Sequence, residues 1–173
     1  MQKKWIIPML SLIVLSIVSC NTNDPANIYA QWKSDNEKYL INMKDSVGYI
    51  RDTVPTNIGN LYYYHKIITA GVTEGSPAYT DHATVNYRGS FITGEVFDST
   101  FKGNNPDSTS TPATFYLNQI IMGWTDNLMK MKKGERRIVI LPQELCYGTS
   151  GFRSIPPYST LRFDIQLISY SGQ

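Results

Sequence analysis

The sequence has 173 residues, of which 42% are hydrophobic and 17% are charged, and a chain of this length is expected to form one domain rather than two. It has 16 basic and 14 acidic residues, but Lys3 and Lys4 precede Cys20, and without them the basic count is 14. A formally neutral chain is not expected to have nucleic acid as its main partner. Two His and two Cys residues are too few for a zinc site, so we expect neither metal nor cofactor.

The N-terminus has the pattern of a processing signal. Two lysines precede an apolar stretch over residues 5–18, which is too short for a transmembrane helix. Residues 17–20, Ile-Val-Ser-Cys, resemble a bacterial lipobox. We therefore expect residues 1–19 to be a lipoprotein signal peptide and Cys20 to carry acyl chains that anchor the protein to a membrane outside the cytoplasm. The alternative is an ordinary secretory signal in which Cys20 occurs by chance.

Residues 26–47 are predicted to form an amphipathic helix. Asp24 and Pro25 suit the N-cap and the first helical position. Such an apolar stripe needs a covering surface, which can be a second copy, a client chain or the protein's own domain. We expect packing against the domain or weak self-association. The apolar residues at helical spacing are Ile28, Trp32, Tyr39 or Leu40, Met43 and Val47.

Residues 53–60 contain Pro, Gly and Asn and are expected to be a linker. We therefore divide the chain into the signal peptide over residues 1–19, a tether with helical extension and linker over residues 20–60, and a main domain over residues 61–173.

Beyond residue 60 the apolar period changes to two, which is typical of strands. Gly94 lies between two such segments and predicts a hairpin turn. The polar segment 102–112 has almost no apolar side chains to bury and predicts a surface loop that costs little to shorten. Strands are expected over residues 61–68, 83–88, 95–98, 114–117, 136–141 and 160–168.

One helix is predicted within the main domain, over residues 123–134. Trp124, Leu128 and Met131 share one face, and Gly134 suits its C-terminal end. The spacing leaves no room for alternating crossover helices. The fold class is therefore α+β, with an antiparallel sheet of five to six strands wrapped over one short helix and preceded by the N-terminal amphipathic helix.

The usual catalytic motifs are absent from the sequence. Residues 148–151, Gly-Thr-Ser-Gly, are one residue short of a nucleophile elbow, and no phosphate-binding Gly-rich motif occurs. His65 and His82 are expected to be surface or satisfied core residues. Asp164 lies on the polar side of an alternating strand and is expected to be solvated. Cys146 is expected to be a buried small residue without a disulfide partner.

Short motifs in chain order, from about residue 61 to 168, resemble those of the FKBP family of peptidyl-prolyl cis-trans isomerases. The N-terminal helix and the lipobox make the chain similar to its lipid-anchored bacterial members. The motifs are Val85-Asn-Tyr87-Arg-Gly89, Gly94-x-x-Phe97-Asp98-Ser99, Gln119-Ile120-Ile121-x-Gly123-Trp124, Lys133-Gly134-Glu135-Arg136, Tyr147-Gly148 and Ile155-Pro156-Pro157-x-Ser159-Thr160-Leu161-x-Phe163-Asp164.

This resemblance implies a prolyl pocket with Trp124 as its floor. The catalytic residues that it implies are Tyr87, Phe97, Asp98, Trp124, Tyr147 and Phe163. The substrate-binding residues that it implies, together with the loop residue near the mouth, are Ile120, Ile121, Phe152 and Ile155. Departures from the family pattern, such as Ala113 and Cys146 and the polar segment 102–112, argue more against tight macrocycle binding than against catalysis.

The implied function is isomerisation of proline-containing polypeptides, as an assistant to the folding of exported proteins. Rotation about an X-Pro bond breaks no covalent bond, so an apolar pocket that favours the twisted amide needs no nucleophile. One alternative is a non-catalytic chaperone or binding module with the same fold. Another is a lipoprotein that captures a small apolar ligand in the same pocket.

Overall fold

The computed structural model describes residues 25–57, 59–72 and 75–172, with side chains from Tyr29 onward. The predicted signal peptide and Cys20 lie outside the described residues. Within the described part of the chain, no helix is long and apolar enough to cross a membrane.

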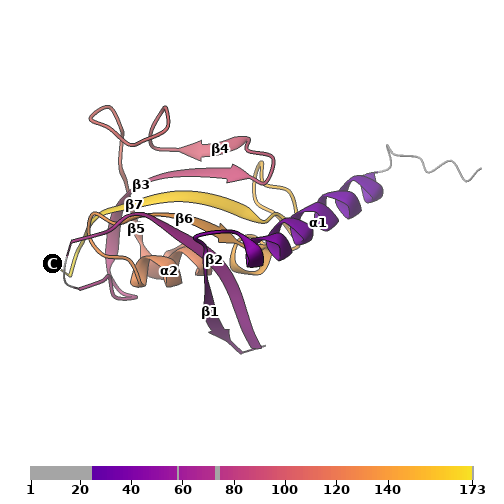
Figure 1. The fold of residues 1–173 in the computed structure, drawn as a ribbon, viewed down its shortest axis with the longest axis horizontal. Coiled ribbons are helices and arrows are strands. Elements are labelled where there is room, and N and C mark those ends of the chain that lie inside the picture. The colour runs from indigo at the N-terminus through magenta and orange to yellow at the C-terminus, as the bar shows by residue number, and fades with distance from the viewer. Residues whose placement is uncertain (1–24, 58, 73–74, 173) are drawn as a thin grey trace, which may run out of the picture.

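Seven strands form one antiparallel sheet that bends around the short helix α2, Met122–Met129 (Figure 1). The strand order is β1-β2-β6-β7-β3-β4. Strand β5 also pairs with β3, on residues 82–85, while β4 pairs with residues 88–90. The expected α+β class is confirmed, with one strand more than predicted. The strands are β1 Ile50–Thr56, β2 Gly59–Thr69, β3 His82–Phe91, β4 Val96–Ser99, β5 Ala113–Tyr116, β6 Arg136–Leu141 and β7 Leu161–Tyr170.

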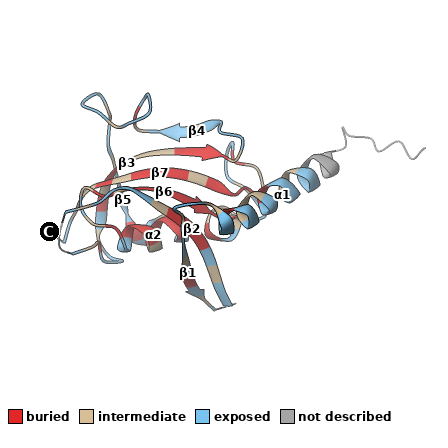
Figure 2. Ribbon diagram, in the orientation of Figure 1, coloured by how far each residue is buried: buried red, intermediate tan, exposed pale blue. Residues whose placement is uncertain are grey.

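The main core lies between α2 and the central strands, where burial concentrates (Figure 2). Leu128 and Met131 are fully buried against it, as are Val139 and Leu141 of β6. Gly123 lets α2 approach the sheet closely, because a Cβ at this position would lie 2.7 Å from the side chain of Leu141. This contact fixes the start of α2, and therefore Trp124, relative to the sheet.

Residues 53–60 do not form a linker. Residues 50–56 are β1, which pairs in register with β2 from Ile50 opposite His65 to Thr56 opposite Gly59. Val54 of β1 is buried in the main core. Turn-forming residues here close a hairpin instead of separating two parts of the chain.

The N-terminal helix α1, Pro25–Asn42, continues into a 3₁₀ turn, Met43–Asp45. The predicted helix is therefore confirmed, but it ends earlier than residue 47. Val47 is 91% exposed, so it is not part of the apolar stripe, and the side chain of Ile28 lies outside the described residues. The rest of the stripe packs against the protein's own domain: Trp32 lies against the main core, and Met43 is buried in a second cluster. Beside the stripe, Asn36 is buried and accepts a 2.7 Å hydrogen bond from the backbone of Thr160.

Asp164 is not solvated. It is 6% exposed, and both of its carboxylate oxygens accept hydrogen bonds from Arg136, at 2.8 and 2.7 Å. Its strand is central in the sheet, and residues 104 and 105 of the polar segment reach over to the same Arg136. The alternation of apolar and polar residues along β7 does place Asp164 on the face away from the core. That face, however, is covered by residues 104 and 105 instead of by water.

Three further sequence expectations concern α2, the histidines and the cysteine. Helix α2 ends at Met129, before the predicted Gly134, which instead lies within the turn into β6 with φ +79°. His65 is buried, with Nδ1 2.8 Å from Asp52 Oδ2, and His82 is exposed. Burial raises the pKa of the half-buried Cys146 thiol well above its ordinary value, which disfavours a reactive thiolate.

Candidate functional site

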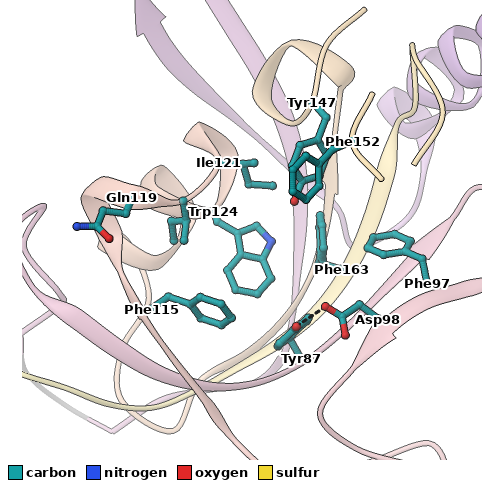
Figure 3. Close-up of a pocket in the computed structure, with 11 residues that line it drawn as sticks. Tyr87, Phe97, Asp98, Phe115, Gln119, Ile121, Trp124, Tyr147, Phe152 and Phe163 are labelled. Atoms are coloured by element: carbon teal, nitrogen blue, oxygen red, sulfur yellow. Dashed lines mark hydrogen bonds between the residues drawn. The ribbon is translucent and has the colours of Figure 1, made fainter. Parts of the chain in front are cut away.

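A cavity of about 360 Å³ opens between the start of α2, the β3–β4 pair and the loop that follows β6 (Figure 3). Most of its lining is aromatic or aliphatic. The lining residues are Tyr87, Phe97, Asp98, Phe115, Gln119, Ile120, Ile121, Trp124, Tyr147, Phe152 and Phe163.

The structure brings together all but one of the residues that the sequence motifs placed at the site. The exception is Ile155, which is buried in the core and pairs through its backbone with Phe152, so it supports the loop without lining the cavity. Two lining residues, Phe115 and Gln119, were missed. The alternation of side chains along β5 could have predicted that Phe115 points inward, since it lies two residues after the half-buried Ala113 and on the same face.

Trp124 lies at the centre of the aromatic cluster and is 5% exposed. Three rings meet it edge-on: Tyr87 at 5.0 Å, Phe163 at 5.3 Å and Phe115 at 5.5 Å between centroids. The three rings surround the indole, as Figure 3 shows, and their packing restricts its orientation. Its buried Nε1 has no hydrogen-bond partner among the described residues.

Phe97 forms the wall next to β3, and Gly89 makes room for it. The two strands pair with Gly89 opposite Asp98, and a Cβ on Gly89 would lie 2.5 Å from the Phe97 ring. Phe97 also meets Phe163 of β7 edge-on at 5.9 Å. The Tyr-Arg-Gly motif of β3 therefore positions two pocket walls, one through Tyr87 and one through the missing side chain of Gly89.

The polar groups of the pocket lie at its rim. The Tyr87 hydroxyl donates a 2.5 Å hydrogen bond to Asp98 Oδ2. Burial and this bond to the carboxylate raise the pKa of Tyr87, so its phenol stays neutral. Burial likewise raises the pKa of Tyr147, whose ring stacks on Phe152 with centroids 5.1 Å apart. The rim therefore presents a carboxylate and two neutral phenols.

This arrangement is suited to binding an apolar ring with polar atoms on either side. Within the described residues, no group of three or more His, Cys, Asp or Glu side chains is placed to hold a metal ion. The pocket lining contains no Ser, Cys, Lys or His side chain that could act as a nucleophile beside a base. The lining is suited to binding by packing and hydrogen bonding.

Comparison with known proteins agrees with the geometry of this pocket. The family model described as FKBP-type peptidyl-prolyl cis-trans isomerase matches residues 74–168, which include the whole pocket lining. The chain belongs to this family.

Relatives within the FKBP-type family include bacterial proteins. The chain is 37% identical over 115 residues to the FKBP-type peptidyl-prolyl cis-trans isomerase FkpA of Escherichia coli K12, covering 66% of this chain and 39% of that one. It is 43% identical over 106 residues to the outer membrane protein MIP of Legionella longbeachae, covering 61% and 42%. It is 32% identical over 160 residues to a probable FKBP-type isomerase of Haemophilus influenzae, covering 92% and 61%.

The fold agrees with the family too. The crystal structure of FkpA from Escherichia coli superposes with a TM-score of 0.68 at 29% identity, covering 84% of this chain and 62% of that one. The chain spans about two fifths to one half of the length of the first curated relatives that it matches.

Proposed function

We propose that this protein is a peptidyl-prolyl cis-trans isomerase that assists the folding of exported polypeptides. The observation that carries the proposal is the mainly aromatic pocket built around Trp124, whose lining holds no Ser, Cys, Lys or His side chain. Membership of the FKBP-type family supports the same conclusion.

The apolar walls act on the barrier of the reaction. Amide resonance gives X-Pro rotation a barrier of about 18–20 kcal/mol. Water stabilises the planar, charge-separated amide, so transfer into a pocket of Phe97, Trp124 and Phe163 removes part of that stabilisation. The twisted amide has less charge separation and loses less on transfer. The pocket thereby binds the transition state better than the ground state, which is the requirement for catalysis.

The rim groups orient the substrate. The neutral phenol of Tyr147 is a donor for a substrate carbonyl, and its stacking on Phe152 restricts its motion. Asp98 accepts from Tyr87 and holds a negative charge beside the cavity, where it interacts with the polar backbone that flanks the proline. Ile120 and Ile121 contact the proline ring from the start of α2.

A refolding assay tests this function. The protein should accelerate the slow, proline-limited refolding phase of an unrelated substrate, which otherwise takes tens to hundreds of seconds. Phe97→Ala and Asp98→Val should each slow the reaction while the domain stays folded. Val96→Ala is the matched control, because Val96 lies in the same strand, is exposed and lies outside the cavity.

Two outcomes separate the alternatives. An unchanged slow phase across several Xaa-Pro sequences would contradict the enzyme. If the same preparation suppressed aggregation of the substrate, the protein would be a binding module that uses the pocket without turnover.

We further propose that the protein is a lipoprotein held at a membrane outside the cytoplasm through Cys20. The support is the Ile-Val-Ser-Cys sequence at residues 17–20 after an apolar stretch. The relative in Legionella longbeachae, described as an outer membrane protein, is consistent with such a location. Cys20→Ala should abolish fatty-acid labelling and membrane retention together, whereas Cys146→Ala should change neither. A Cys20→Ala protein that stays in the membrane fraction would contradict the proposal.

A further inference from the structure

The N-terminal helix α1 reaches the pocket through a continuous series of aromatic rings. Trp32 meets Phe91 edge-on, with centroids 5.9 Å apart, and Phe91 lies 5.1 Å from Phe97. Phe97 in turn meets Phe163 at 5.9 Å, and Phe163 meets Trp124 at 5.3 Å. Three of these five rings line the cavity, while Phe91 and Trp32 lie behind them.

A second set of contacts joins α1 to the loop on the other side of the pocket. Trp32 Nε1 donates a 3.2 Å hydrogen bond to Ser159 Oγ, which itself donates at 2.7 Å to the carbonyl of Pro156. One turn further along α1, Asn36 accepts from the Thr160 backbone, and its own carbonyl accepts from the Thr160 hydroxyl at 3.3 Å. These contacts hold the end of the loop that begins with Tyr147 and carries Phe152.

We propose that Trp32 is a positioning residue for the pocket. It fixes the position of the Phe97 ring through Phe91, and it fixes the position of the Tyr147–Phe152 loop through Ser159. The inference rests on the proposed isomerase function but concerns a part of the chain outside both the matched family segment and the cavity. Trp32 does not touch the substrate; it acts through the residues that do.

The packing explains why Trp32 has this effect. Phe91 is 8% exposed and is the last residue of β3, at the hairpin that leads to Phe97. On its outer side it is covered by Trp32. Without that indole, Phe91 gains space to tilt outward, and Phe97 loses the ring that backs it. Because Gly89 offers Phe97 only a backbone surface, the position of this wall depends on the rings packed against it, which are Phe91 and Phe163.

The test compares two residues of the same helix. Trp32→Ala should lower kcat/KM for an Xaa-Pro peptide about three- to tenfold, with a raised KM, while Ile41→Ala should change neither constant. Ile41 is the matched control because it is an apolar residue of α1 that is 63% exposed. The raised KM is informative, since partial unfolding lowers the amount of active protein and leaves KM unchanged.

A second measurement does not depend on activity. NMR resonances of the Phe97 ring and the Trp124 indole should shift in Trp32→Ala and stay in place in Ile41→Ala. Trp32→Phe, which keeps a ring against Phe91, should restore most of the wild-type KM, and Ser159→Ala should isolate the contribution of the loop. If Trp32→Ala does not fold, Trp32→Leu replaces it, with the same expected changes.

The outcomes separate this inference from the proposed function. Folded Trp32→Ala or Trp32→Leu protein with wild-type KM and unshifted Phe97 and Trp124 resonances would overturn the inference, even with a fully active wild type. A wild-type protein without isomerase activity would overturn the proposed function, while shifts at Phe97 and Trp124 would still support the coupling from α1.

Discussion

The Tyr87 hydroxyl and the Asp98 carboxylate are joined by a 2.5 Å hydrogen bond across the β3–β4 pair, at the rim of the pocket. The bond uses one oxygen of Asp98 and fixes the phenol of Tyr87, whose ring also meets Trp124. A single contact therefore couples the negative charge of the rim to the aromatic floor.

Loss of this bond should lower activity without unfolding the domain. Tyr87→Phe keeps the ring against Trp124 and removes only the hydroxyl, so we expect kcat/KM to fall about fivefold, which corresponds to one hydrogen bond of about 1 kcal/mol. Peptide isomerisation kinetics measure this change. Tyr116→Phe is the control, because Tyr116 is exposed on β5 and outside the cavity. Equal activity of Tyr87→Phe and wild type would show that the bond has no part in the reaction.

Activity should not decline in mildly alkaline solution. Burial raises the pKa of both Tyr87 and Tyr147, and the bond to Asp98 raises that of Tyr87 further, so each phenol titrates above the ordinary tyrosine pKa of about 10. The kcat/KM profile should therefore be flat from about pH 7 to about pH 9, and any alkaline fall should come above the ordinary tyrosine pKa of about 10. A fall with an apparent pKa near 9.5 to 10 would mean that one phenol titrates as it does in water.

Stability should depend on pH through His65. Burial, together with nearby Arg137, lowers the pKa of His65, although Asp52 and Glu135 oppose the shift. Between the lowered pKa and the unfolded value of about 6.5, the unfolded chain binds more protons than the folded one. The free energy of unfolding should therefore fall as the pH falls from about 7 through the unfolded histidine pKa of about 6.5.

Urea denaturation at several pH values measures the effect of His65. His65→Gln should reduce the pH slope in this window, whereas His82→Gln, at an exposed position, should leave it unchanged. The same slope in His65→Gln and wild type would assign the pH dependence to other groups.

The polar segment 102–112 is anchored through Asn104 and Asn105, unlike the loop expected from its composition. Arg136 Nη1 donates to Asn105 Oδ1 at 2.7 Å, and its Nη2 donates to the carbonyl of Asn104 at 2.9 Å. Arg136→Ala should lower the free energy of unfolding by about 3 kcal/mol, because it leaves Asp164 buried and unpaired. Arg136→Ala/Asp164→Ala should recover part of this loss, and deletion of residues 107–109 should cost little.

Thermal or urea unfolding measures these stabilities, with Arg153→Ala as an exposed control. A large loss on deletion of residues 107–109 would show that the tip is packed as tightly as the anchored end.

Sequence reasoning succeeded where one physical signal dominated. Strand β6 was predicted with its observed ends, because nearly every residue of this central strand is apolar or paired and buried. The pocket lining came from motifs whose spacing matches a known family. Phe115 was missed because its segment predicts a strand without showing which face lies toward α2. Gln119 belongs to one of the motifs, but the resemblance assigned it no role in the pocket.

The wrong predictions share a cause: the pattern of neighbouring residues does not reveal which distant residues a segment contacts in the fold. Residues 53–60 look like a linker until β2 supplies the pairing of β1. Asp164 looks solvated until Arg136 and residues 104 and 105 cover it. Trp32 was assigned only to an apolar stripe, since its nearest ring, Phe91, lies 59 positions further along the chain.

The two end strands in the order of the sheet, β1 and β4, each have an edge that is not paired with another described strand. An exposed strand edge is a template on which an unfolded chain can add itself as a further strand and start aggregation. Pro55 in β1 has no backbone N–H to offer, and β4 is only four residues long. With the proposed function, the protein would thereby be protected from recruiting its unfolded substrates into its own sheet.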